Sequence, residues 1–166
     1  MKRLNELSPD DALAEFLKCC GSTSWSQAMT AIRPFKSIDH LLEKADSAWW
    51  SLDQEDWLEA FRSHPKIGEQ KAAAAQSEQA QSWSAQEQSA TSGAATEIMR
   101  ALAEGNREYE QRFGFIYIVC ATGKSPDELL KILNARLNND AETELRNAAE
   151  EQRKITRLRL EKLLNQ

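Results

Sequence analysis

The sequence predicts an all-α protein with no β-sheet. Helix N-cap signals recur along the chain, and only one short stretch has the composition of a strand. A lone strand leaves its backbone N–H and C=O groups without partners, so this stretch cannot build a sheet. The 166 residues contain no Gly-, Ser- or Pro-rich break long enough to be a linker, so we expect a single domain over residues 1–166.

Composition and charge restrict the partners. Apolar residues make up 41% and charged residues 28% of the chain, as in ordinary soluble globular proteins. The net charge of -5, with no basic stripe, argues against binding to nucleic acid or to an anionic membrane. The N-terminal "MKRLNELSPDD" lacks the apolar core of a signal peptide, and no window reaches the length of a membrane span. We therefore expect a cytoplasmic protein.

The cysteines predict neither a disulfide framework nor a zinc site. Cys19, Cys20 and Cys120 are odd in number, two of them are adjacent, and none forms a C-x-x-C pair. Free cysteine commonly behaves as a small apolar side chain. We expect all three to be buried free thiols.

Two helices are predicted from start and stop signals near the N-terminus. "SPDD" at 8–11 supplies a serine N-cap, a proline at the first helical position and two carboxylates at the positive end of the helix dipole. It predicts a helix over 9–20, with Gly21 as its stop. "SWSQ" at 24–27 fits a capping box, and its helix must end near Arg33 because a proline follows there.

Two amphipathic helices and a less regular stretch come next. Ser37 can cap "IDHLLEKADSAWW", 38–50, and Asp53 can cap "QEDWLEAFRS", 54–63. The polar stretch 69–82 is rich in alanine and glutamine, and we expect it to begin as a helix and continue as a connection.

The second half of the chain carries similar signals. "SAQE" is a capping box that predicts a helix over 84–104, after which "EGNREYEQRFG", 104–114, is expected to fray or turn. "SPDE" at 125–128 repeats the first signal and predicts a helix that runs to about residue 137. Asp140 caps the last helix, which is expected to run to about residue 163.

The stretch "FGFIYIVCAT", 113–122, is the exception to this helical pattern. Its β-branched and aromatic residues are typical of a buried strand. Without a second strand to pair with, it must be helical or an extended segment packed among helices. An extended segment of this kind is able to offer free N–H groups to a bound ligand.

Two opposite charges point inward from different predicted helices. At about 100° per residue, the last helix places Arg159 inside its apolar arc, whereas Arg153 and Arg157 fall outside it. That arc consists of Leu145, Ala148, Ala149, Ile155, Leu160 and Leu163. The helix after Ser84 projects Glu87 from the middle of its apolar face. That face consists of Ala90, Ala94, Ile98, Ala101 and Leu102.

Burying an ion is costly unless the ion is paired with an opposite charge or binds a ligand in a polar pocket. A structural ion pair and a polar pocket are therefore equal alternatives for Glu87 and Arg159. Glu87 is also the third helical residue of the Ser84 capping box, which is a sufficient structural reason for a glutamate there. Arg159 can instead extend its charged end to solvent from the end of its helix.

The two histidines differ in their surroundings. His64 follows a helix with apolar residues at helical spacing, and Pro65 forces its backbone out of helical geometry, so its ring is presented from a fixed helix end. A histidine there can also merely complement the helix dipole. His40 lies opposite the apolar face of its helix, and we expect it to be solvated.

Five stretches of the chain stand in a characteristic order. They are "WSQAMTAIRPF" at 25–35, "SHPKIGE" at 63–69, "WSAQEQSA" at 83–90, "FGFIYIVCATGKSPDELLKILNARLNND" at 113–140 and "ELRNAAEEQRKITRLRLEKL" at 144–163. In order and spacing they resemble the 2-oxo-4-hydroxy-4-carboxy-5-ureidoimidazoline (OHCU) decarboxylase family, which completes the route from urate to allantoin. The resemblance covers the full length, and several motifs at the right spacing are far more specific than one.

The resemblance implies an all-α bundle of about eight or more helices, which is cofactor-free, binds no metal and forms a homodimer. It implies catalytic roles for His64 of the histidine–proline motif, Glu87 of "SAQEQ" and Arg159 of the terminal "LRL". The helical wheel independently selects Arg159 over Arg157. The implied substrate-binding residues are Pro65, Ser84 and Gln88, and the backbone of Phe115, Ile116, Tyr117, Ile118 and Val119.

The implied reaction is the decarboxylation of OHCU to (S)-allantoin in purine catabolism. Loss of carbon dioxide leaves an electron pair, which most decarboxylases place in a cofactor or beside a metal. The sequence contains neither a phosphate-binding glycine loop nor a metal-ligand cluster, so the conjugated ring of the substrate must accept that pair.

Each implied catalytic residue suits one part of this chemistry. Arg159 can hold an anionic or oxo group with its planar fork. Glu87 can accept N–H bonds and disfavour the charged ground state beside the departing carboxylate. His64 can transfer a proton near neutral pH, and delivery to one ring face yields one enantiomer of allantoin.

A second class of protein is compatible with the same residues. A non-catalytic helical adaptor or ligand-binding domain would use the same amphipathic helices, with Glu87 and Arg159 as a structural pair and His64 as a helix cap. Turnover of OHCU distinguishes the two classes.

Overall fold

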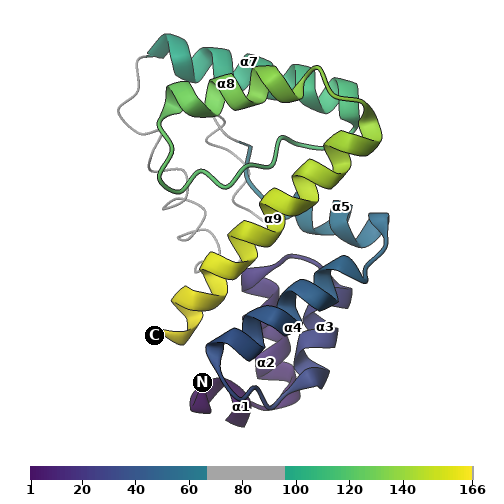
Figure 1. The fold of residues 1–166 in the computed structure, drawn as a ribbon, viewed down its shortest axis with the longest axis vertical. Helices are drawn as coiled ribbons and strands as arrows, with labels where there is room; N and C mark the ends of the chain where they lie inside the picture. The colour runs from purple at the N-terminus through teal and green to yellow at the C-terminus, as the bar shows by residue number, and fades with distance from the viewer. Residues whose placement is uncertain (67–95, 166) are drawn as a thin grey trace. The chain divides into compact units, whose positions relative to one another are not determined.

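The computed structural model describes residues 1–66 and 96–165, and its helices are drawn in Figure 1. Over those residues the chain forms eight helices and no strand, which confirms the predicted all-α class. The helices are α1 Lys2–Glu6, α2 Pro9–Cys19, α3 Thr23–Ile32, α4 Ile38–Trp50, α5 Gln54–Arg62, α7 Thr96–Phe113, α8 Pro126–Arg136 and α9 Ala141–Leu164. None of these described helices is long and apolar enough to cross a membrane.

Two compact units make up the chain, and each is described by itself. The first unit consists of Met1–Ala60 and Arg153–Gln166, and the second of Phe61–Gln152. The first part of α9 thus belongs to the second unit and its last part to the first. The single domain inferred from the lack of a linker stays a prediction. The stretch 69–82, and the start of the helix predicted over 84–104, lie outside the described residues.

In the first unit, α2 packs on α3 and α3 packs on α4. The rings of Phe16 and Trp25 meet edge to face with their centroids 5.9 Å apart. The indole N–H of Trp25 donates to the carbonyl of Ala45 at 3.0 Å. A tryptophan contributes a large apolar surface to a core when its single donor is paired, and Trp25 is fully buried.

Most predicted N-caps are confirmed. The hydroxyl of Ser8 accepts from Asp11 N at 3.2 Å, and that of Ser37 accepts from His40 N at 3.1 Å. Ser125 and Glu128 form the reciprocal capping box at the start of α8. The carboxylates that cap α5 and α9 belong to Asp53 and Asp140, which accept from Asp56 N and Thr143 N at 3.1 and 2.8 Å.

The start of α3 and the end of α2 were predicted wrongly by one or two residues. Ser22, rather than Ser24, is the N-cap of α3 and accepts from Trp25 N. Glu59 of α5 accepts from the backbone N–H and hydroxyl of Thr23 at 3.0 and 2.7 Å, so a tertiary partner satisfies the earlier first turn. Helix α2 ends because Cys20 is extended (φ -140, ψ 122), one residue before the predicted stop.

Helix α1 was not predicted because its stability comes from tertiary contacts. It has five residues, too few to be stable alone. Asn5 exchanges two hydrogen bonds with the backbone of Phe35, at 2.8 and 2.9 Å. Arg33 donates to the carbonyls of Leu4 and Leu7 at 3.0 and 2.8 Å. In the stretch "RPF" at 33–35, Arg33 and Phe35 therefore serve to hold α1 in place.

Helix α7 corrects the expectation that residues 104–114 fray or turn. It continues to Phe113 and ends at Gly114, whose φ of 78 favours glycine. Gly105, which indicated a break, instead permits close packing against α8, because a Cβ built on it would lie 2.7 Å from Leu133 Cδ2. Leu102, Gly105 and Tyr109 share one buried face at helical spacing.

The strand-like stretch is neither a helix nor part of a sheet. Residues 114–125 connect α7 and α8 without regular structure, and the two helices pack side by side (Figure 1). The buried residues of this connection are Phe115, Tyr117, Ile118, Val119, Cys120 and Ala121. Of the two alternatives left by the sequence, the structure therefore has the packed non-helical segment.

Candidate functional site

The structure describes part of the predicted site. His64, Pro65 and the segment 115–119 lie in the second unit, whereas Arg159 lies in the first. Within the second unit, the end of α5 and the segment 115–119 lie together. Ser84, Glu87 and Gln88 lie outside the described residues.

The end of α5 fixes the backbone of His64. His64 N donates to the carbonyl of Phe61 at 3.1 Å, and the following Pro65 lies outside the helix. Helix α5 ends at Arg62, so His64 lies outside the helix, as its position before a proline predicts. The His64 side chain is half-buried and its Nε2 atom is buried. The ring of Phe61 packs on that of Phe115 at 5.4 Å, which joins the helix end to the segment 115–119.

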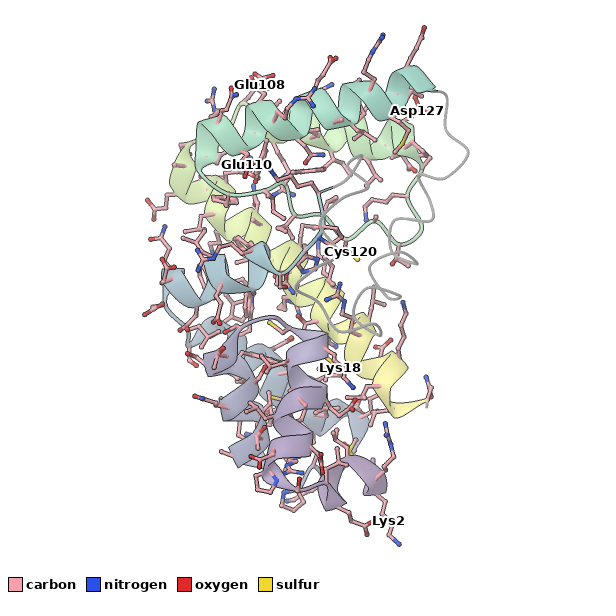
Figure 2. All side chains as sticks on the ribbon, turned by 180° about the vertical axis from the view of Figure 1, so that it is seen from behind. Lys2, Lys18, Glu108, Glu110, Cys120 and Asp127 are labelled. Carbon is pink, nitrogen blue, oxygen red and sulfur yellow. The ribbon has the colours of Figure 1, made fainter. Side chains whose placement is uncertain are left out.

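An ion pair holds the residue after the histidine–proline motif. Lys66 Nζ lies 2.6 Å from Glu110 Oε2, and both side chains are about one-third exposed. Glu110 stands on α7, where Figure 2 labels it. The pair therefore ties the chain that leaves His64 to the helix that precedes the segment 115–119.

The segment 115–119 keeps backbone donors available. Within the described residues, the N–H groups of Ile116, Tyr117, Ile118 and Val119 have no hydrogen-bond acceptor. Buried N–H groups are almost always paired in folded proteins, because desolvation without a partner is costly. A polar molecule bound beside the segment would supply the missing acceptors.

Charged side chains hold the carboxyl end of this segment. Arg136 Nη1 donates to the carbonyl of Ile118 at 2.7 Å. The N–H of Cys120, labelled in Figure 2, donates to Glu151 Oε2 at 2.7 Å, and its carbonyl accepts from Lys124 Nζ at 2.7 Å. Three peptide groups in succession therefore have fixed orientations.

Arg136 belongs to a buried polar cluster that the sequence argument missed. Its Nε donates to Glu144 Oε1 at 2.6 Å, and its Nη2 lies 3.2 Å from the hydroxyl of Tyr109. That hydroxyl also donates to Glu144. Burial raises the pKa of Tyr109, so the phenol stays protonated and serves as a donor. The other carboxylate oxygen of Glu144 accepts from Asn139 at 2.7 Å.

A signal for this cluster was present in the sequence. Arg136 follows Leu129 and Leu133 at helical spacing, and all three are buried on α8. Glu144 stands four residues before Ala148 on the buried face of α9 and is fully buried. A helical wheel for α8, like the one for α9 that selected Arg159, would have selected Arg136.

Arg159 is buried as predicted, with only 2% of its surface exposed. Arg153 and Arg157, predicted to lie outside the apolar arc, both pair with Asp46, at 2.7 and 2.8 Å. Leu145 of the predicted arc is only half-buried, whereas Gln152 and Thr156 are buried on the same helix.

The three cysteines are buried free thiols, as predicted. Burial raises the pKa of Cys20 to about 11, against the smaller opposing influences of Ser22, Thr156 and Arg159. Burial likewise raises the pKa of Cys19, and the charge of Arg159 opposes this shift. The thiols of Cys19 and Cys20 are therefore protonated at neutral pH and unreactive.

His40 is less solvated than predicted. It is half-buried, and its Nδ1 accepts from Lys36 N at 3.2 Å. Its ring meets that of Phe35 edge to face at 6.1 Å. His40 thus stabilises the turn before α4. In the described part of the chain, no group of three or more His, Cys, Asp or Glu side chains is placed to hold a metal ion.

Comparisons with known proteins agree with the fold and with the motifs. The sequence profile of the family described as OHCU decarboxylase matches residues 5–161. A solved OHCU decarboxylase, crystallised in the presence of (S)-allantoin, is 34% identical with a TM-score of 0.79, and the match covers 92% of this chain and 99% of that one. A solved (S)-allantoin synthase, 16% identical with a TM-score of 0.69, shares the fold.

Two relatives differ in how much of their length the chain spans. The Arabidopsis thaliana uric acid degradation bifunctional protein TTL is 35% identical over 151 residues, which are 91% of this chain but 47% of that protein. The Haloferax volcanii 2-oxo-4-hydroxy-4-carboxy-5-ureidoimidazoline decarboxylase is 28% identical over 96% of this chain and 93% of its own length.

The all-helical fold, with a histidine–proline motif beside a buried irregular segment, defines the class of protein. The solved decarboxylase shares this fold, and the plant protein is similar in sequence over the matching region. The chain belongs to the OHCU decarboxylase family.

Proposed function

We propose that this chain catalyses the decarboxylation of OHCU to (S)-allantoin, the last step of urate conversion to allantoin. The observation that carries the proposal is the family match over residues 5–161. The archaeal relative, named as this decarboxylase, aligns along nearly the whole of both chains. The bifunctional plant relative is about twice as long, and its other activity is not part of the proposal.

The reaction divides into bond cleavage and proton delivery. The bond between C4 and the carboxylate breaks, its electron pair enters the conjugated ring system, and carbon dioxide leaves. The 4-hydroxyl then loses its proton as C4 becomes a carbonyl, and a proton adds to C5, the ring carbon that bears the ureido group. The ring serves as the electron sink, so the protein must hold it in place, stabilise negative charge and deliver a proton to one face.

His64, Glu87 and Arg159 are our proposed catalytic residues. Arg159, a buried arginine with a planar fork, suits an anionic or oxo group of the substrate. Glu87 accepts from the ring or ureido N–H groups and disfavours the charged carboxylate relative to the transition state. His64 transfers the proton, and its backbone is fixed by the end of α5.

Pro65, Ser84, Gln88 and the backbone of residues 115–119 are the proposed substrate-binding groups. The support from geometry is the row of backbone N–H groups in that segment with no acceptor in the described chain. Such donors, held by the fold, suit the oxo oxygens of bound OHCU.

We further propose that the enzyme works without cofactor or metal, as a homodimer in the cytoplasm. The three buried free thiols suit a reducing compartment. The dimer is an implication of the family resemblance. Light scattering on the purified protein at several concentrations measures it directly, and a mass of one chain throughout would contradict it.

The decisive experiment uses freshly generated OHCU. Urate is oxidised and hydrolysed in the cuvette, the chain is added, and circular dichroism follows the formation of (S)-allantoin while carbon dioxide release is measured. We expect both signals to rise in proportion to the protein added. An adaptor or binding domain would leave both at the rate of spontaneous decay.

A further inference from the structure

The structure assigns a role to Arg136 in the reaction: it is a positioning residue that turns the peptide group between Ile118 and Val119 so that the Val119 N–H faces the substrate. This inference rests on the proposed function, because it concerns the segment proposed to bind OHCU. It adds a residue on α8 that the family motifs did not single out.

The geometry of one peptide group carries the argument. The bond between Ile118 and Val119 is trans, since the cis bond in the described chain joins Arg33 and Pro34. In a trans peptide the C=O and N–H groups point in opposite directions. Arg136 Nη1 donates a hydrogen bond to the Ile118 carbonyl at 2.7 Å, so the Val119 N–H must point away from the guanidinium.

The guanidinium itself is held from several sides. Glu144 and Tyr109 bind its Nε and Nη2 at 2.6 and 3.2 Å. The rings of Tyr109 and Tyr117 lie 5.7 and 5.0 Å from its central carbon. Tyr117 also donates from its hydroxyl to the carbonyl of Leu129 on α8, at 3.3 Å. The Ile118 carbonyl therefore meets a donor whose position the fold fixes.

Stability alone does not explain this arrangement. Buried ion pairs commonly stabilise a fold no more than apolar side chains of similar volume, because desolvation offsets the attraction between the charges. Arg136 is 8% exposed and Glu144 fully buried, so their desolvation is large. What apolar residues cannot do is hold a backbone carbonyl in one direction. The charge pair thus serves to orient the segment.

The test compares a variant that keeps the bond from Arg136 to the Ile118 carbonyl with one that loses it. Glu144→Gln removes one charge and keeps Arg136. The double variant Arg136→Met with Glu144→Gln removes both charges together, which avoids an unpaired buried carboxylate. Arg112→Met is the matched control, because Arg112 also lies over a ring, Phe113, and donates to a backbone carbonyl, that of Asn139, but is exposed.

We expect the double variant to have a KM for OHCU about tenfold above that of Glu144→Gln, the loss of about one hydrogen bond, with kcat within about threefold. Arg112→Met should match the wild type in both constants. Equal KM values for the double variant and Glu144→Gln, with both folded by circular dichroism, would overturn the inference. If the double variant does not fold, Arg136→Lys replaces it, because lysine lacks the planar fork that binds Glu144 and the Ile118 carbonyl through separate nitrogens.

A second readout separates this inference from the proposed function. In ¹H–¹⁵N spectra, the Val119 amide signal should differ between Glu144→Gln and the double variant, and (S)-allantoin should shift it in the wild type. Failure of the wild type to turn over OHCU would defeat the proposed function. An unchanged Val119 signal in the double variant would defeat the orienting role of Arg136, whatever the activity.

Discussion

Lys66 Nζ and Glu110 Oε2 lie 2.6 Å apart, and this pair joins the residue after Pro65 to α7. The side chains are 33% and 39% exposed, so solvent screens their attraction. The pair is therefore better suited to holding the chain beside His64 than to stabilising the fold.

We predict that Lys66→Met changes the free energy of unfolding by at most about 1 kcal/mol. If the pair keeps His64 in its productive position, kcat should fall by roughly three- to tenfold, because small misplacements of catalytic groups are costly. Lys66→Arg keeps the charge and should retain most of the rate. Urea denaturation and OHCU turnover measure the two effects, and a loss of stability without loss of kcat would contradict this role.

His64→Asn should lower kcat by roughly 100-fold or more, which is the size of general acid–base contributions. The change should leave the fold intact, since asparagine retains a polar side chain on the same backbone. His40→Asn is the matched control, because His40 accepts a hydrogen bond from Lys36 N at the turn before α4 and has no proposed role in the reaction, so kcat should not change. A folded His64→Asn variant with a near wild-type rate would rule out proton transfer by His64.

Arg159→Lys keeps the charge and loses the planar fork, so kcat/KM should fall sharply with little change in stability. Arg159→Met should be folded and nearly inactive. The alternative is that Arg159 is the structural partner of Glu87. In that case Arg159→Met should cost roughly 3–5 kcal/mol in the free energy of unfolding, and the added Glu87→Gln should restore it. Denaturant titration of the three variants decides between these outcomes.

Activity should survive exhaustive dialysis against a chelator, because the substrate supplies its own electron sink. The pure protein should show no absorbance in the visible range. The measurement is the rate of OHCU turnover before and after dialysis, with metal added back to a parallel sample. Activity that is lost on dialysis and restored by one metal would reveal a metal site.

The three thiols should react slowly with a thiol reagent at pH 8 in the folded protein and rapidly in denaturant. With the pKa of Cys20 raised to about 11, only about one molecule in a thousand carries that thiolate at pH 8. Reactivity should rise as the pH approaches 11, because a raised pKa moves ionisation upward. A fast phase equivalent to one thiol at pH 8 would show that one cysteine is accessible.

Capping and turn residues made much of the fold predictable. Ser8, Ser37, Asp53, Ser125 and Asp140 each bind a backbone N–H within the next three residues, so the signal and its effect are local. The periodicity of α9 likewise identified Arg159 as buried, because a helix converts spacing into direction without reference to the rest of the chain.

Other features depended on partners far away in the sequence. Helix α1 is held by Arg33 and Phe35, and α3 begins early because Glu59 satisfies its first turn. Glycine intrinsically disfavours a helix, yet Gly105 lies inside α7. A glycine is suited to this position because a larger residue would crowd Leu133 of α8.

The sequence by itself determined the helical class, the main helix starts, the buried thiols and the inward direction of Arg159. Only the tertiary structure decided that residues 115–119 are irregular and that the Ile118 carbonyl faces Arg136. The physical reason is that capping and periodicity act within one or two turns of a chain. The direction of a peptide group outside regular structure is set by whichever donor the fold brings to its carbonyl.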